Sequence, residues 1–150
     1  MRYELRKVVV MGILSSILAA CAGERPNNLG ERDGLLTACP ASPNCVSSQA
    51  DDKHRIAPLA FGGDPDAAFA RLKLVLGKRA DTAIIDERAG YLRVELRTHL
   101  FVDDGEFLLD RTHSVIHVRS ASRLGYSDLG KNRSRMEEIR REFSHSEPKL

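Results

Sequence analysis

The chain has 150 residues, of which 42% are hydrophobic, so it suits one domain with one hydrophobic core and is too short for two. Its formal net charge of +2 argues against a general nucleic-acid binder, which would show a clear basic excess. Tryptophan is absent and aromatic residues make up 5% of the chain, which argues against a base-stacking platform or an aromatic sugar-binding groove.

Residues 1–20 have the features of a secretory signal. Arg2, Arg6 and Lys7 precede an apolar run over residues 8–20. This run is shorter than the about 20 apolar residues that a membrane-spanning helix needs. Without the signal the chain would hold 20 basic residues (23 less 3) and 20 acidic residues (21 less 1), so the small basic excess belongs to the signal.

The signal ends in Leu18-Ala19-Ala20-Cys21, which resembles the lipobox of bacterial lipoproteins, where the cysteine is acylated and becomes the first residue. The resemblance implies a lipid on Cys21 that anchors the protein to a membrane of the bacterial cell envelope, facing the periplasm. In enteric-type sorting an aspartate after the cysteine retains a lipoprotein in the inner membrane. Ala22 at this position therefore favours the outer membrane over the inner.

The two remaining cysteines, Cys39 and Cys45, make an even pair in a protein exported to an oxidising compartment. We predict a disulfide between them, which would close a small loop and stabilise the fold by roughly 2 kcal/mol in the chain-entropy model. Structural zinc usually uses cysteines two to four residues apart and needs two more ligands. A thioredoxin-like redox site uses Cys-x-x-Cys. We expect neither a metal ion nor a cofactor.

Residues 21–34 are polar and interrupted by glycine and proline, which predicts a flexible tether. A single domain is then expected over residues 35–145. Pro58 limits residues 56–59 to an edge strand, because proline cannot donate to a central ladder.

A helix is predicted to begin at Asp64-Pro65-Asp66, where an N-cap acid, a proline and a second acid follow one another. Gly77 predicts its end. The apolar residues at helical spacing, which should form its buried stripe, are Phe69, Leu72, Val75 and Leu76.

The rest of the domain shows mainly a two-residue period. Strands are predicted over residues 83–86, 91–98, 100–109 and 114–122, and a last helix begins near Asn132 with an apolar stripe of Met136, Ile139 and Phe143. These elements predict an α+β fold, in which two helices pack on the one apolar face of an antiparallel meander sheet of about four to five strands.

Polar side chains concentrate in residues 119–133, which run from a strand end through a glycine-containing loop to a helix start. A helix start exposes free N–H groups that suit an anion. The candidate anion-binding residues are Arg119, Ser120, Ser122, Arg123, Tyr126 and Arg133. The alternative is that these arginines form ion pairs with acids on neighbouring strands and that the hydroxyls cap turns.

A second candidate site contains acid–base groups. Asp103, Asp104 and His117 are the candidate catalytic residues, with Asp104 on one face of its strand and Asp103 on the other. His113 lies on the same strand face as His117 if the strand is regular, but no third metal ligand is evident. A solvated or arginine-paired strand face is the alternative for the acids.

Several ordered motifs resemble the domain-of-unknown-function family 1499. They are Cys39-Pro40-Ala41-Ser42-Pro43-Asn44-Cys45-Val46-Ser47-Ser48-Gln49, Phe101-Val102-Asp103-Asp104, and Val115-Ile116-His117-Val118-Arg119-Ser120-Ala121-Ser122-Arg123 with Gly125-Tyr126-Ser127-Asp128-Leu129-Gly130 and Asn132-Arg133. The resemblance covers about residues 35–143. It implies a shared domain and an envelope location, and no established activity.

Three functions stay open at this point. The first is a binding or accessory lipoprotein, whose segment 119–133 holds an anionic small molecule or a cell-wall fragment. The second is an envelope enzyme, hydrolase-like, that uses Asp103, Asp104 or His117 as an acid or base. The third is a structural or assembly protein without a small-molecule site.

Overall fold

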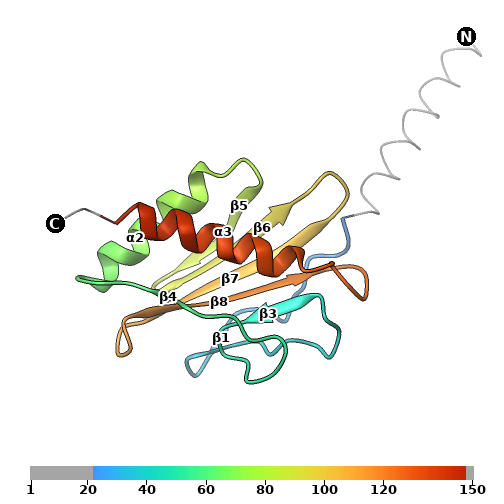
Figure 1. The fold of residues 1–150 in the computed structure, drawn as a ribbon, viewed down its shortest axis with the longest axis horizontal. Helices are drawn as coiled ribbons and strands as arrows, with labels where there is room; N and C mark the ends of the chain where they lie inside the picture. The colour runs from blue at the N-terminus through green and yellow to red at the C-terminus, as the bar shows by residue number, and fades with distance from the viewer. Residues whose placement is uncertain (1–21, 148–150) are drawn as a thin grey trace, which may run out of the picture.

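The computed structural model describes residues 22–147 (Figure 1). In chain order its elements are β1 (Glu31–Arg32), β2 (Leu35–Leu36), β3 (Cys45–Ser47), β4 (Leu59–Ala60), α2 (Pro65–Lys78), β5 (Thr82–Arg88), β6 (Tyr91–Arg97), β7 (Val102–Asp110), β8 (Val115–Ser122) and α3 (Lys131–His145). The predicted signal and Cys21 lie outside the described residues. No helix within residues 22–147 is both long enough and apolar enough to cross a bilayer.

Six strands form one antiparallel sheet in the order β3-β8-β7-β6-β5, with β4 also paired to β8. The prediction of an α+β fold with an antiparallel meander and two helices is confirmed. The sheet has more strands than the four to five expected. The difference comes mainly from β3, whose three residues are all buried and therefore show no alternation.

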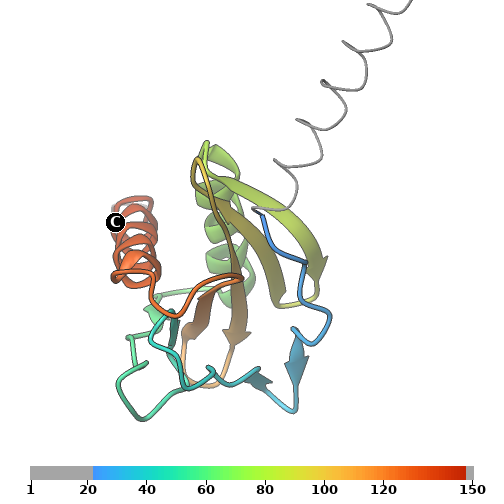
Figure 2. The same ribbon diagram turned by 90° about the vertical axis from the view of Figure 1, so that its right-hand side faces the viewer.

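The pairing register gives the central sheet one apolar and one polar face, because directly opposed residues share a face. Leu92 pairs with Phe107, and Phe107 with Val118, which makes an apolar row across three strands. The next residues make a polar row of Arg93, Glu106 and Arg119 on the opposite face. Figure 2 shows the two helices on one side of the sheet and the amino-terminal segment on the other.

Helix α2 begins as predicted, with the Asp64 side chain accepting the N–H of Ala67 at 2.7 Å. It continues one residue past Gly77 to Lys78. The helices and the apolar sheet face bury one core, which includes Leu72, Leu76, Leu92, Val94, Phe107, Met136, Ile139 and Phe143. Phe69, which was expected in the buried stripe, is partly buried at the edge of this core.

Gly105 allows the core to close over β7. A Cβ atom on Gly105 would lie 2.8 Å from Val94 Cγ2 and 3.0 Å from Leu96 Cδ1. Both neighbours are fully buried. The space beside Gly105 is therefore already filled by side chains from β6.

Gly105→Ala is expected to destabilise the protein by about 1–3 kcal/mol, because the added methyl group overpacks the core. Gly77→Ala is the matched control, since Gly77 is exposed in α2 and an added Cβ would meet nothing within 4 Å. That change should stabilise the protein by about 1 kcal/mol through helix propensity. Denaturant unfolding measures both, and a Gly105→Ala variant as stable as the parent would contradict the packing.

Candidate functional site

Three carboxylates are buried on the polar face of the sheet. Glu95, Asp104 and Glu106 are 1%, 1% and 0% exposed, respectively. Asp104 lies opposite Glu95 in the β6–β7 ladder, and Glu106 lies one pleat further along the same face. Buried charges of one sign are costly unless cations and hydrogen-bond donors compensate them.

Five arginines surround these acids: Arg25, Arg93, Arg97, Arg119 and Arg123. We call these eight residues the ion-pair network. It has two more positive than negative charges. Ion pairing between arginines and acids on neighbouring strands is the alternative that the sequence left open to an anion-binding pocket.

Arg123 is the central cation of the ion-pair network. Its Nε donates to Asp104 Oδ2 at 2.7 Å, and its Nη2 donates to Glu95 Oε1 at 2.6 Å. Hydrogen bonding to Asp104 raises the pKa of Arg123, although burial opposes the shift. Burial would raise the pKa of Glu95, but the hydrogen bonds from Arg123 and Arg25 outweigh it and lower the pKa to about 2.

Glu106 binds three donors from different parts of the chain. Oε1 accepts the Tyr91 hydroxyl and the Gly30 N–H, both at 2.8 Å, and Oε2 accepts Arg119 Nη1 at 3.2 Å. Burial lowers the pKa of Arg119, with Glu106 opposing the shift. Burial also raises the pKa of Tyr91, and the Glu106 charge adds to this effect. Tyr91 is therefore a hydrogen-bond donor over the whole physiological range.

The segment predicted as a tether lies against this polar face where the structure describes it. Arg25 Nε donates to Glu95 at 2.8 Å, the Pro26 carbonyl accepts Arg93 Nη2 at 2.9 Å, and Gly30 donates to Glu106. The packed unit thus includes residues before Leu35. The glycine and proline content of this segment predicts flexibility. The contacts that hold the segment depend on buried acids on β6 and β7, which its own composition cannot indicate.

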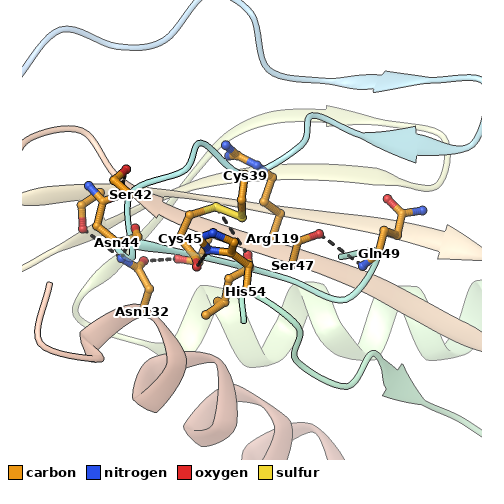
Figure 3. The surroundings of a disulfide bond; sticks show 12 residues. Cys39, Ser42, Asn44, Cys45, Ser47, Gln49, His54, Arg119 and Asn132 are labelled. Atoms are coloured by element: carbon orange, nitrogen blue, oxygen red, sulfur yellow. Dashed lines mark hydrogen bonds between the residues drawn. A yellow bond between two sulfur atoms is a disulfide. The ribbon is translucent and has the colours of Figure 1, made fainter. Parts of the chain in front are cut away.

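The predicted disulfide between Cys39 and Cys45 is confirmed (Figure 3). The loop that it closes is tied to the β8–α3 connection by Asn44. The Asn44 carbonyl accepts the Ser122 N–H at 3.0 Å, and its Nδ2 donates to the Gly125 carbonyl at 2.6 Å. The disulfide therefore fixes a loop that holds the connection leading into α3.

The start of α3 already holds an anionic group from its own chain. Asp128 Oδ1 accepts the Gly130 N–H at 3.0 Å, and Asp128 Oδ2 accepts the backbone N–H and the side-chain Nδ2 of Asn132 at 2.8 Å each. The free N–H groups that the sequence suggested for a ligand are thus taken up by a carboxylate three residues before the first helical residue.

The six candidate anion-binding residues do not converge on one pocket. Arg119 and Arg123 belong to the ion-pair network, whereas Ser120 and Ser122 bond to Asn132 on the helix side of the sheet. Arg133 donates to the carbonyls of the 53–55 turn, at 3.1 and 2.8 Å. Tyr126 is 74% exposed in the loop before α3.

The candidate acid–base residues also lie apart. Asp103 faces the helices, where its Oδ2 accepts Arg135 Nη1 at 2.6 Å, and Asp104 is in the ion-pair network. His117 lies at the other end of the sheet, beside a pocket of about 540 Å³. Its Nδ1 is 3.1 Å from Ser48 Oγ and its Nε2 is 3.4 Å from Asp110 Oδ2.

Ser48, His117 and Asp110 contact one another in series and have the residue types of a hydrolytic triad. The Ser48 hydroxyl, however, has a structural role in the sheet. Its Oγ accepts the Val118 N–H at 2.9 Å, and the residue is 6% exposed. A hydroxyl in this position satisfies a backbone donor where β3 ends. His113 also contacts Asp110, at 2.7 Å. Among residues 22–147 no three His, Cys, Asp or Glu side chains are grouped so as to hold a metal ion.

Sequence reasoning missed Asn44, Arg25 and Arg93 as members of these polar contacts. The alternation of β6 placed Arg93 and Glu95 on one face and thus gave a signal for part of the ion-pair network. Nothing local distinguishes Asn44 or Arg25, because their partners are 81 and 70 residues away in the chain.

A small apolar pocket of about 220 Å³ lies between the β6–β7 loop and the β8–α3 loop. Phe101 comes from the first loop, and Leu124 and Leu129 come from the second. The polar residues of the lining are Thr98, Asp103, Ser122, Ser127, Asp128 and Lys131. This pocket includes part of the segment 119–133 that the sequence singled out, but its lining is mainly apolar rather than cationic.

A family model described as "Protein of unknown function (DUF1499)" matches residues 35–143. No match was found among curated proteins or among solved structures.

Arg123→Met is expected to lower the free energy of unfolding by about 3 kcal/mol, because it leaves two buried carboxylates short of a partner. Arg111→Met is the matched control. Arg111 pairs with Asp66 on the surface, with both side chains more than half exposed, so solvent screens the pair and its loss should cost much less stability than the loss of Arg123. Denaturant titration at pH 7 compares the two, and equal costs would contradict a buried network.

Acid should unfold the protein through Glu95. Because its pKa is lowered to about 2, its contribution is complete above the unfolded-state pKa of about 4.3 and is lost as the pH falls from about 5 to 2. The pKa of Asp110 is also lowered to about 2, by hydrogen bonds from His113, so Asp110 contributes to the same loss of stability at low pH. Unfolding curves between pH 7 and pH 2.5 measure the loss. A Glu95→Gln variant with the same pH dependence as the parent would refute this assignment.

Proposed function

This chain belongs to the DUF1499 family, and we propose that it acts as a lipid-anchored binding or accessory domain of the bacterial cell envelope. The observation that carries the proposal is the pairing of Cys39 with Cys45. Disulfides persist in oxidising compartments such as the periplasm. The chain has three cysteines, so this pairing leaves Cys21 of the Leu-Ala-Ala-Cys sequence for acylation.

The polar contacts support an accessory role over an enzymatic one. Asp103 and Asp104, two of the candidate acid–base groups, are each paired with buried arginines, and a catalytic acid or base must be free to exchange its proton with a substrate. The candidate nucleophile Ser48 satisfies a backbone N–H. These side chains hold the fold together and leave the loops at one end of the sheet to contact a partner.

The pocket between the loops supports binding of an apolar group. Phe101, Leu124 and Leu129 line it together with hydroxyl groups, Asp103, Asp128 and Lys131. Ligand sites commonly combine a mainly apolar wall with a few polar groups that set orientation. Its volume of about 220 Å³ is enough for a short hydrocarbon segment rather than for a whole glycan.

Cys21→Ser is expected to abolish both metabolic labelling with an alkyne fatty acid and sedimentation with membranes. The double variant Cys39→Ser/Cys45→Ser is the matched control, because it removes two thiols and keeps the acylation site. It should retain the label, although at lower abundance, since loss of a native disulfide costs about 2–5 kcal/mol. Mass spectrometry that finds Met1 retained and Cys21 unmodified in the parent protein would refute the proposal.

A further inference from the structure

Exposed apolar side chains gather at one end of the molecule. Of the seven large apolar side chains exposed within residues 22–147, two are in the β6–β7 loop and three are in the β8–α3 loop. These five are Leu100 (65% exposed), Phe101 (52%), Leu124 (43%), Tyr126 (74%) and Leu129 (96%). We call this set the apolar tip.

The two loops of the apolar tip adjoin each other. Phe101 from one loop and Leu124 and Leu129 from the other line the same pocket of about 220 Å³. Both loops lie at the right-hand end of the sheet in Figure 1. Leu129 also has a positive φ of 53°, in a turn that directs its side chain into solvent at 96% exposure. A backbone conformation that L residues rarely adopt therefore exposes a leucine.

The amino-terminal chain reaches the domain at this same end. Gly23 packs so closely on the β8–α3 loop that an added Cβ would lie 2.9 Å from Arg123 Cβ and 3.0 Å from Leu124 Cγ. Its φ of +68° is one that L side chains rarely adopt. The entry point of the chain is thus fixed beside the apolar tip.

We propose that the apolar tip inserts into the interface of the bilayer to which Cys21 is anchored. This inference rests on the proposed lipid anchor. Cys21 is two residue steps from Gly23, which contacts Leu124, and an extended chain spans at most about 3.6 Å per residue. A lipid on residue 21 is therefore attached within about 7 Å of Gly23 whatever the conformation of the link.

The chemistry of the apolar tip suits a phospholipid surface. Monomeric proteins rarely expose groups of large apolar side chains unless these contact a partner or a membrane. Phe101 and Tyr126 are aromatic, and aromatic side chains favour the depth of the headgroups. Lys131 is exposed nearby at the start of α3, where it would meet anionic headgroups. Two carboxylates, Asp103 and Asp128, also line the pocket of the apolar tip, and each is bonded within the domain, Asp103 to Arg135 and Asp128 to Asn132.

The absence of tryptophan makes the depth of each loop directly measurable. Phe101→Trp and Leu129→Trp place a single fluorophore in each loop of the apolar tip. Leu74→Trp is the matched control. Leu74 is 65% exposed, between the values for Phe101 and Leu129, but it lies on α2. The full processed, lipidated chain is reconstituted in vesicles of phosphatidylethanolamine and phosphatidylglycerol, with and without brominated acyl chains.

The expected result is that brominated lipid removes roughly half or more of the Phe101→Trp and Leu129→Trp emission and shifts it to the blue, while Leu74→Trp is unaffected. Vesicle-bound protein without quenching at either loop overturns the inference and leaves the anchor intact. Equal quenching at Leu74 overturns it as well, and so does a blue shift without quenching that accompanies dimer formation. Protein that stays in the aqueous fraction refutes the proposed anchor, and the inference with it.

Discussion

Neutralising three carboxylates inside the protein is the constraint that organises the polar half of this fold. Glu95, Asp104 and Glu106 lie on the face of the sheet opposite the helices and are almost fully buried. Ions removed from water cost several kcal/mol each unless they are paired and hydrogen-bonded. The protein meets this cost with five arginines, a tyrosine hydroxyl and a backbone N–H. The amino-terminal segment is held in place because it supplies two of these donors, through Arg25 and Gly30.

The helices and the central meander could be predicted because the sequence patterns that specify them lie within each element. The alternation of Leu92 and Val94 with Arg93 and Glu95 predicted β6 and both of its environments. Helix α2 was recognisable from its Asp-Pro-Asp start. In contrast, β3 consists of three buried residues that pair with β8, so no alternation of buried and exposed residues marks it. The short strands at the sheet edge are set by what they pair with, not by their own pattern.

The candidate site likewise combines features that the local sequence indicates with contacts that it does not. The sequence indicated correctly that segment 119–133 contains many polar groups near a helix start. Whether such groups bind a ligand or one another depends on contacts between residues that are far apart in the sequence. In this structure Asp128 accepts a backbone N–H at the start of α3, and Arg123 pairs with acids on β6 and β7. Asn44, Ser122 and Asn132, which lie in the motifs that the sequence singled out, therefore connect the disulfide loop with β8 and α3. The large apolar residues of the same segment, Leu124, Tyr126 and Leu129, are exposed instead.

In the lipid-anchored form proposed above, the position of Arg25 would have a mechanical consequence. A pull transmitted along the chain reaches Gly23 first and then the Arg25–Glu95 pair, before it reaches the Gly30–Glu106 hydrogen bond. Tension would thus be resisted by polar contacts to β6 and β7, which are inner strands of the sheet, instead of by an edge strand. In that form, the contacts of residues 25–30 with the sheet would resist drag on the domain from its amino-terminal side.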